Sequence, residues 1–192
     1  MQDLHAKIDL IVTSPLTRTL ETTLRAYGPA IQRDGLFKVV CLPQLQEVND
    51  YPCDTGSSRE SLEAHPEFSR LDFSTLTPEW TGKRGLYDPA NVSLRAQWVR
   101  QWLFARPEKC IVVVSHGDML RNLISGPNQP SGYGWRNAEV REFGFMEGEG
   151  GRGECWLDPE GAVAVAGGYD LTSSEIAEEI DGGVDPEVFA KR

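Results

Sequence analysis

The chain has 192 residues, enough for one domain with a sizeable core, and its 40% hydrophobic and 25% charged residues are ordinary for a soluble protein. A formal net charge of −10 opposes non-specific binding to nucleic acid, which depends on basic contacts to phosphates. A small anionic partner remains compatible with that charge, because it needs only a local basic pocket. No apolar run approaches the roughly 20 residues that cross a bilayer, so we expect no membrane insertion.

The amino-terminal segment and the cysteines both favour a cytoplasmic protein. Residues 1–7 contain no apolar leader segment. The four cysteines are scattered, without a Cys-x-x-Cys pair or a histidine at zinc-ligand spacing, so we expect neutral thiols in a reducing compartment. Glycine-rich nucleotide loops are also missing from the sequence, and we therefore expect neither a metal nor a cofactor.

The first predicted unit is a strand, a turn and a helix. Residues 8–13 form an apolar run typical of a short buried strand. Ser14 is suited to cap the following helix and Pro15 to occupy its first position, and Gly28 is expected to end it. One face of this helix carries three leucines, namely Leu16, Leu20 and Leu24.

Arg18 falls in the first turn of that helix. There the unpaired backbone N–H groups and the helix dipole favour an anion, and a guanidinium adds a fork that matches phosphate or carboxylate. Position alone leaves a second interpretation open, in which Arg18 is a solvated surface arginine or a partner for Glu21.

A second strand is predicted at 37–42, and the loop after it contains Glu47. Leu45 and Val48 flank this carboxyl group, and partial desolvation would favour its protonated form and suit a general acid. The alternative is an ordinary loop glutamate that faces solvent.

Residues 51–90 are polar and rich in turns, with a helical start only at 58–64, where Ser58 is a candidate cap. We interpret this segment as a lid or specificity insert over a site and not as a separate domain. Its aromatic residues either anchor the insert to the body of the domain, which is favoured, or form substrate walls. They are Phe73, Trp80 and Tyr87.

The strongest helix signal spans 91–105, where an apolar stripe is assigned to the core. This stripe consists of Leu94, Trp98, Val99, Trp102, Leu103 and Ala105. The helix is followed by a predicted strand at 111–114, and the two strand–helix units together favour a βαβ arrangement with a largely parallel sheet.

The strand at 111–114 runs into Ser115-His116-Gly117, and a further helix is predicted from Met119. His116 is therefore expected at the carboxyl end of a buried strand, the edge at which open α/β sheets bind ligands. The alternative is that His116 is only a well hydrogen-bonded turn residue.

The remaining sequence predicts weaker elements. Strands are expected at 138–146 and 162–166, and a short acidic helix at 173–180. We assign 1–170 to a single α/β domain and 171–192 to an acidic tail that is loosely packed or disordered. The sequence carries no indication of the oligomeric state.

Several motifs together resemble one known family. The run from Ser14 to Thr22 resembles the Ser-Pro-Leu-x-Arg-x-x-x-Thr signature of the histidine phosphatase superfamily, the phosphoglycerate mutase-like proteins. Ser115-His116-Gly117 resembles its second histidine motif, and Leu45-Gln46-Glu47 is similar to the loop that carries its acid. Gly134-Trp135-x-Asn137-x-Glu139 resembles a branch found widely in fungi. The resemblance implies a three-layer α/β fold with a mostly parallel sheet flanked by helices.

The resemblance also implies phosphoryl transfer through a phosphohistidine, on a small phosphorylated substrate and without a metal. By motif, Arg18 is then a phosphate clamp and His116 the second histidine that stabilises the phosphoryl oxygens. Glu47 is the acid or base, and Ser14 belongs to the phosphate-binding residues.

The sequence departs from the family at the nucleophile. The family carries it in an Arg-His-Gly or Arg-His-Ala motif on a first strand, which this sequence does not contain. That strand is expected between the strands at 8–13 and 111–114, so its absence should also remove backbone pairing partners. His5 and His65 do not match its position.

Three hypotheses remain open. The chain is an amino-terminally incomplete form of a small-molecule phosphatase or mutase, a catalytically inactive family member that binds anions and regulates, or an acid–base enzyme such as a dehydratase or isomerase in a biosynthetic pathway.

Overall fold

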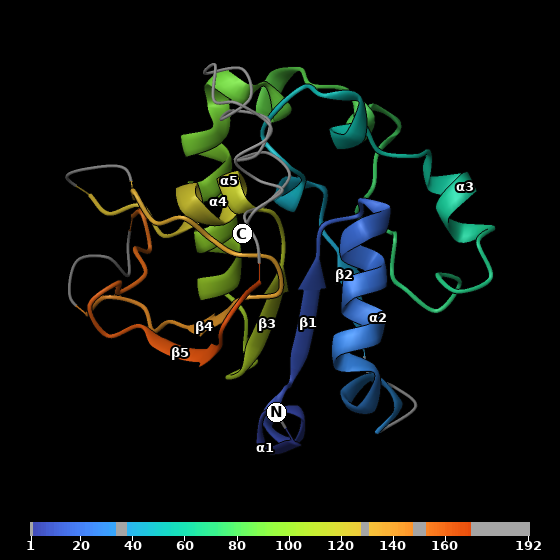
Figure 1. Ribbon diagram of the computed structural model, residues 1–192. Coiled ribbons are helices and arrows are strands. Elements are labelled where there is room, and N and C mark those ends of the chain that lie inside the picture. Colours follow the sequence, from blue (N-terminus) through green and yellow to red (C-terminus); the bar gives the residue numbers. More distant parts are fainter. Residues whose placement is uncertain (1, 34–37, 128–130, 148–152, 170–192) are drawn as a thin grey trace, which may run out of the picture.

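The computed structural model describes residues 2–33, 38–127, 131–147 and 153–169. A three-stranded parallel sheet lies at its centre, with β1 (Leu10–Thr13) between β2 (Val39–Cys41) and β3 (Ile111–Val114) (Figure 1). Thr13 lies opposite Cys41 on one side and Val114 on the other, so the three strands end at the same edge. The predicted parallel α/β sheet is thus confirmed.

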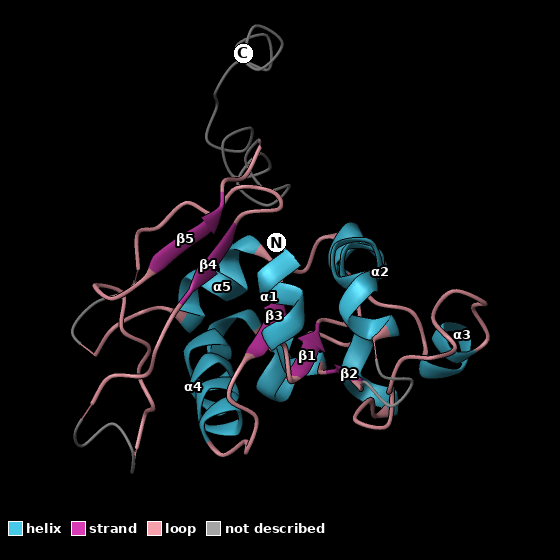
Figure 2. Ribbon diagram, turned by 90° about the horizontal axis from the view of Figure 1, so that it is seen from below, coloured by secondary structure: helices cyan, strands magenta, loops and turns pink. Residues whose placement is uncertain are grey.

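Helices flank this sheet on two faces, as the view from below shows (Figure 2). Ile11 of β1 packs into a cluster with α2 (Thr17–Gln32), whereas Leu10 and Val12 pack into a second cluster. The second cluster includes residues of α4 (Val92–Phe104) and α5 (Gly117–Leu123). Because successive strand residues point to opposite faces, a continuous apolar run is needed to fill both layers.

The strands β1 and β3 pair directly, with Leu10 opposite Ile111 and Val12 opposite Val113. The sequence predicts that the absence of a central strand leaves both strands without pairing partners at this boundary. That expectation is wrong for these residues, since two parallel β-branched strands can satisfy each other's backbone groups.

Two expectations for α2 are also wrong. Its first residue is Thr17, and the hydroxyl of Ser14 accepts a hydrogen bond from the backbone N–H of Leu16, 3.3 Å away, without capping the helix itself. The helix does not end at Gly28 but continues through Pro29 to Gln32. Tyr27 and Ala30 are buried in the core, so tertiary packing outweighs the low helix propensity of Gly and Pro.

The segment 51–90 packs on the sheet layer through its aromatic residues. Phe73 and Trp80 are buried in the cluster that contains α2, which bears out the anchoring interpretation. A Cβ atom on Gly56 would lie 1.9 Å from the Trp80 ring, so the chain can cross the ring only with glycine there. The short helix α3 (Arg59–Glu63) begins after Ser58, whose hydroxyl accepts from the Ser61 N–H as predicted.

The helix α4 buries only part of the expected apolar stripe, with Val99 and Leu103 in the core. Leu94 is 59% exposed and Trp98 is 37% exposed, whereas Arg95 and Arg100 are buried. Apolar periodicity missed these two arginines because their guanidiniums face groups from distant parts of the chain, which a local pattern does not contain.

The face of α4 can be tested by stability. We expect Leu94→Gln to change the free energy of unfolding by no more than about 0.5 kcal/mol. Val99→Ala, on the fully buried face, should lower it by about 1–3 kcal/mol. Chemical denaturation of both variants checks this, and a larger loss for Leu94→Gln would contradict the assignment.

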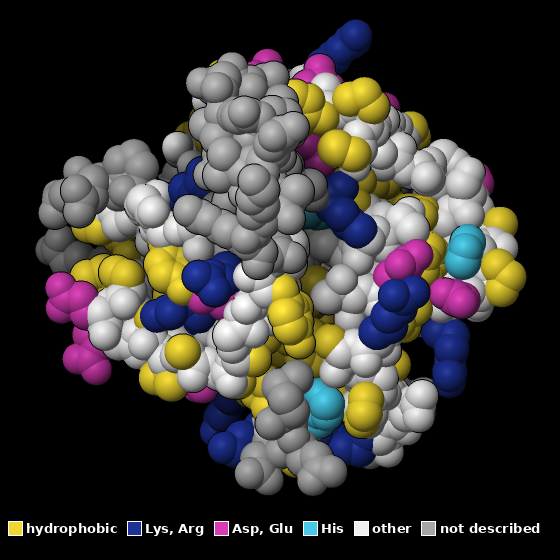
Figure 3. Space-filling view, viewed as in Figure 1, with side chains coloured by type: hydrophobic (Ala, Val, Ile, Leu, Met, Phe, Trp, Pro, Cys, Tyr) yellow, Lys and Arg dark blue, Asp and Glu magenta, His cyan; other side chains and the backbone are white. Residues whose placement is uncertain are grey.

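Two further strands form a separate antiparallel pair, β4 (Val140–Glu142) and β5 (Val163–Ala166). They correspond to the strands predicted at 138–146 and 162–166. Hydrophobic side chains lie at the surface between this pair and α2 (Figure 3). The short α1 (Gln2–Lys7) contacts α2. The acidic helix at 173–180 and the tail lie outside the described residues, and no helix of the described part has the length and apolar character to span a membrane.

Candidate functional site

The site lies where β1 and β3 end. The chain leaves β1 at Ser14 and leaves β3 at Ser115 and His116. Because the two strands are adjacent and parallel, these turns meet, and His116 Nε2 is 2.8 Å from the hydroxyl of Ser14. The order of the strands thus brings together residues that are 102 positions apart in sequence.

His116 is held in one tautomer. Arg18 Nε–H donates a hydrogen bond to His116 Nδ1 at 3.2 Å. Since arginine can only donate, Nδ1 is unprotonated, and Nε2 carries the proton and donates it toward Ser14. His116 is 6% exposed, and burial, followed by the charges of Arg18, Lys83 and Arg95, holds the pKa of His116 well below its usual value. The imidazole is therefore neutral at pH 7.

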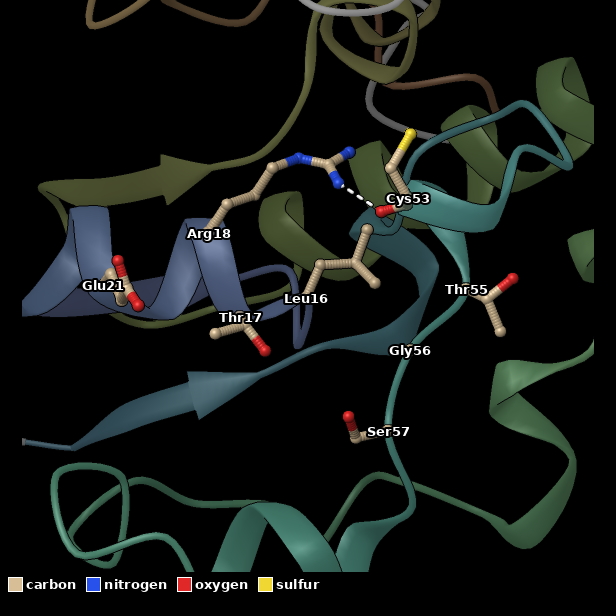
Figure 4. A pocket seen from close by; sticks show the side chains of 8 residues that line it. All are labelled: Leu16, Thr17, Arg18, Glu21, Cys53, Thr55, Gly56 and Ser57. Carbon is tan, nitrogen blue, oxygen red and sulfur yellow. Dashed lines mark hydrogen bonds between the residues drawn. The ribbon is translucent and has the colours of Figure 1, made fainter.

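Arg18 links three parts of the fold. Besides His116, its Nη1 donates to the carbonyl of Cys53 at 2.6 Å (Figure 4). Its Nη2 donates to Asp54 Oδ1 at 2.7 Å. Glu21 pairs with Arg25 at 3.4 Å, so it does not serve as the partner that the alternative interpretation gave to Arg18. The guanidinium therefore joins α2 to the histidine turn and to the insert.

Asp54 competes with any anion that approaches Arg18. Its carboxylate is buried against the guanidinium and accepts from Nη2, which is one of the donors that Arg18 could offer an anion. We expect Asp54→Asn to strengthen the binding of inorganic phosphate about 3- to 10-fold, because one opposing charge is removed. Calorimetric titration measures this change, with the exposed Glu67→Gln as a charge-matched control, and unchanged affinity would contradict it.

The loop containing Glu47 is fixed at both sides. Glu47 is 1% exposed, so it does not face solvent, and its Oε1 accepts from the Val48 N–H at 2.8 Å. Ser115 donates to the Leu45 carbonyl at 2.7 Å, which ties this loop to the histidine turn. Lys83 Nζ donates to the Glu47 carbonyl at 2.7 Å. The loop is thereby positioned against the site before any ligand binds.

A half-buried lysine and a buried arginine near Glu47 were not predicted. Burial, together with Arg95, lowers the pKa of Lys83 to about 8, although nearby carboxylates including Asp54 and Glu47 oppose this. Burial lowers the pKa of Arg95 to about 10, and Glu47 and Tyr87 oppose the change. The burial of Arg95 could have been predicted from the sequence, because Arg95 lies four residues before the core residue Val99 and therefore on the same helix face. The burial of Lys83 could not, since it lies in a segment without periodicity.

Two cavities meet at Arg18. A cavity of about 380 Å³ is lined by Arg18, Glu47 and His116, and also by α2 and the residues before β4. A second cavity of about 310 Å³ lies between the start of α2 and residues 53–57 (Figure 4). Its lining is mostly polar and includes the hydroxyls of Thr17, Thr55 and Ser57.

The low pKa of His116 predicts how stability depends on pH. In the unfolded chain a histidine binds a proton near pH 6.5, whereas folded His116 resists protonation. The unfolded state therefore binds more protons below about pH 6.5, and His116 should destabilise the fold as pH falls from there. We expect His116→Gln to reduce the slope of unfolding free energy against pH between pH 6.5 and 4.5. Equal slopes in both proteins, measured by urea denaturation, would refute this.

The other histidines lie elsewhere. His5 packs edge-on against Tyr27, and His65 stacks on Phe68. Of the three histidines in the sequence, only His116 therefore reaches the site. Within the described ranges, no group of three or more His, Cys, Asp or Glu side chains is arranged to hold a metal ion.

The parallel sheet, with an arginine and a neutral histidine at its carboxyl edge, defines an α/β protein with a candidate site at that edge. Residues 2–155 match the family model of the histidine phosphatase superfamily (branch 1), and the chain belongs to this superfamily.

Individual relatives agree with this assignment. The chain is 32% identical over 118 residues to a probable phosphatase of Schizosaccharomyces pombe, covering 59% of this chain and 53% of the relative. It is 26% identical over 149 residues to a phosphoglycerate mutase-like protein of Arabidopsis thaliana, covering 62% and 53%. The chain thus spans about half the length of the curated relatives it matches. No solved structure matches it.

Proposed function

We propose that this chain forms the phosphate-binding half of an enzyme that hydrolyses, or transfers the phosphoryl group of, a small phosphate monoester. The observation that carries this proposal is the Arg18–His116 pair at the ends of β1 and β3. A guanidinium and a neutral imidazole with its proton on Nε2 are two donors that suit phosphoryl oxygens.

The local charge supports an anionic ligand. Arg18, Lys83 and Arg95 gather around His116, and the buried carboxylates among them are Glu47 and Asp54. These three cations outnumber the two buried carboxylates, and an excess of buried positive charge is costly unless an anion compensates it. A phosphate dianion has the charge and the acceptor oxygens to do so.

Each residue has a proposed role. Arg18 clamps the phosphate, His116 donates its Nε2 proton to a phosphoryl oxygen in place of Ser14, and Ser14 accepts or donates at the rim of the same site. Glu47 transfers a proton to or from the reacting oxygen. The polar cavity beside Arg18 would hold the leaving group, with residues 51–90 as the insert that sets specificity.

A phosphohistidine mechanism needs a second histidine, which must come from residues outside this sequence. We propose that it lies on a strand ending in Arg-His-Gly or Arg-His-Ala, as in the family, and that the chain belongs to the fungal-type branch and acts in the cytoplasm. The partial coverage of the relatives supports a contribution from further residues.

The second candidate is a binding protein that uses the same anion site without chemistry. The site itself favours it, because Arg18 and His116 need no nucleophile to hold phosphate. The two candidates share the ligand and differ only in turnover.

Two measurements separate these candidates. Calorimetry with inorganic phosphate tests the site itself, and the absence of saturable binding at millimolar phosphate would refute both. Hydrolysis of p-nitrophenyl phosphate is then compared between the 192-residue chain and a form extended by its upstream in-frame codons. Turnover only in the extended form supports the enzyme, and binding without turnover in either form supports the binding protein.

A further inference from the structure

Asp118 is a buried charged residue near His116 to which the proposed roles give no part. It is 6% exposed and lies in the first turn of α5, two residues after His116. A buried carboxylate is costly unless hydrogen bonds and an opposite charge compensate it. The partners of Asp118 therefore show what its burial holds in place.

The two oxygens of the Asp118 carboxylate face different partners. Oδ1 lies 2.9 Å from Nη1 of Arg121, three residues further along the same helix. Oδ2 accepts a hydrogen bond at 3.0 Å from Nδ2 of Asn49, which is 69 positions away in sequence. The pair with Arg121 is a local helix contact, and an acidic residue in the first turn also suits the helix dipole. Neither effect accounts for the contact with Asn49, which joins α5 to the loop that contains Glu47.

The contact with Asn49 is the second of two hydrogen bonds between the Glu47 loop and the histidine turn. In the first, the Ser115 hydroxyl donates to the carbonyl of Leu45 at 2.7 Å. Leu45 lies two residues before Glu47 and Asn49 lies two residues after it, and their partners lie on the two sides of the histidine. The two bonds therefore bracket Glu47 on one segment and the histidine on the other.

Two such bonds fix more of the geometry than one. A single hydrogen bond lets the loop rotate about the bonded atoms, whereas a bond at each end sets both the distance and the orientation of the residue between them. The Glu47 side chain follows the loop backbone, because its Oε1 accepts from the Val48 N–H at 2.8 Å. The contact at each end of the loop thus helps to place the carboxyl group.

The placement of a proton-transferring group has a large effect on rate. A proton passes efficiently only when its donor and acceptor atoms lie about 2.6–3.2 Å apart. A displacement of about 1 Å can lower the rate about 100-fold. Contacts that fix the Glu47 loop relative to the histidine are therefore expected to affect the chemical step more than the binding of phosphate.

We propose that Asp118 is a positioning residue, which acts through Asn49 to hold the Glu47 carboxyl at the distance from the phosphate that proton transfer requires. The reaction itself rests on the proposed function, whereas the contacts that hold the loop belong to the free protein. In this role Asp118 acts only through the loop and exchanges no proton with the substrate.

The first test measures hydrolysis of p-nitrophenyl phosphate by the form extended by its upstream in-frame codons. Asn49→Ala and Asp118→Ala should each lower kcat about 10- to 100-fold. They should change KM less than about 3-fold, because Arg18 and His116 still bind the phosphate. Asp118→Asn keeps an oxygen that accepts from Asn49, so it should retain at least about one third of kcat.

Asn122→Ala is the matched control for Asn49→Ala. Asn122 Nδ2 donates to the backbone carbonyl of Asp118 at 2.9 Å, and this bond stays within α5. The control removes the same kind of side chain next to Asp118, and kcat should stay within about 2-fold of the natural value. Equal losses of kcat in Asn122→Ala and Asn49→Ala would overturn the proposal, and so would a raised KM with unchanged kcat in Asp118→Ala.

The second test needs no substrate and uses the 192-residue chain. Hydrogen exchange of the Val48 amide, measured by NMR, reports how often the loop opens and breaks the bond to the Glu47 carboxyl. We expect Asn49→Ala and Asp118→Ala to accelerate this exchange at least about 5-fold, and Asn122→Ala to leave it unchanged. Unchanged exchange in Asn49→Ala overturns the proposal. Asn49 is a half-buried loop residue, so this variant decides the matter even if Asp118→Ala does not fold.

The two tests separate failure of this proposal from failure of the proposed function. If the natural extended form hydrolyses no phosphate ester, the proposed enzyme is refuted, and accelerated Val48 exchange would still establish that Asp118 holds the Glu47 loop. If the natural extended form is active and Asn49→Ala leaves its kcat unchanged, the proposed function stands and the positioning role is refuted.

Discussion

Replacing Arg18 with alanine should weaken the binding of inorganic phosphate about 10- to 100-fold, because a hydrogen bond between charged groups contributes about 1.5–3 kcal/mol. The same change removes the donor to His116 Nδ1 and the charge that helps keep the imidazole neutral. We therefore expect the pKa of His116 to rise toward its usual value in this variant. Calorimetry gives the first effect, and proton NMR of the imidazole gives the second.

Two further variants show whether geometry or charge matters at Arg18. Arg18→Lys keeps the positive charge without the fork, and it should bind phosphate with intermediate affinity. Arg25→Ala removes an exposed arginine of the same helix and should leave phosphate binding unchanged. If Arg18→Ala and Arg25→Ala bind phosphate equally well, Arg18 is not part of the anion site.

Replacing Arg100 with methionine should lower the free energy of unfolding by about 3 kcal/mol, which corresponds to roughly 6–12 °C in melting temperature for a chain of this size. Arg100 is a buried residue of α4 that donates to the carbonyls of Glu154, at 2.9 Å, and Leu123, at 3.3 Å. It also stacks over the Trp156 ring at 4.0 Å. Methionine fills part of the volume but leaves these buried carbonyls without a donor.

The ion pair of Arg100 provides the control for this prediction. Its partner Glu154 lies 3.5 Å away and is partly exposed, so Glu154→Gln should cost no more than about 1 kcal/mol. Thermal unfolding of both variants tests this difference. Equal losses would indicate that the ion pair, and not the backbone contacts, holds the segment around Trp156 to α4.

The parallel sheet could be predicted because its strands are marked locally. The apolar runs at 8–13 and 111–114 are each followed by a serine and then by helical sequence. Repeated strand–helix units of this kind form a parallel sheet. The length of α2 could not be predicted, because Gly28 and Pro29 end helices in isolation and are overruled here by the burial of Tyr27. The burial of Tyr27 depends on residues from the whole core, which the sequence of the helix does not contain.

The site could be predicted only where a motif marked it. Arg18, Glu47 and His116 were singled out from their turns and neighbours, and all three line one cavity. Asp54 and Lys83 come from a segment without periodicity. The folding of this segment over the sheet edge brings them to Arg18 and to the Glu47 loop. Arg95 and Arg100 face inward because the groups they face lie far away in sequence, so hydrophobicity alone did not place them on the buried side of α4.

The direct pairing of β1 and β3 fixes the distance between the turns that follow these two strands. Neighbouring strands lie about 4.8 Å apart, and one strand inserted between β1 and β3 would separate them by about 10 Å. The 2.8 Å contact between Ser14 and His116 cannot span that distance. A histidine-bearing strand placed there would therefore take over the contacts on His116 that Ser14 now makes. The nitrogen chemical shifts of His116 thus report which of the two strand spacings a given form of the protein adopts.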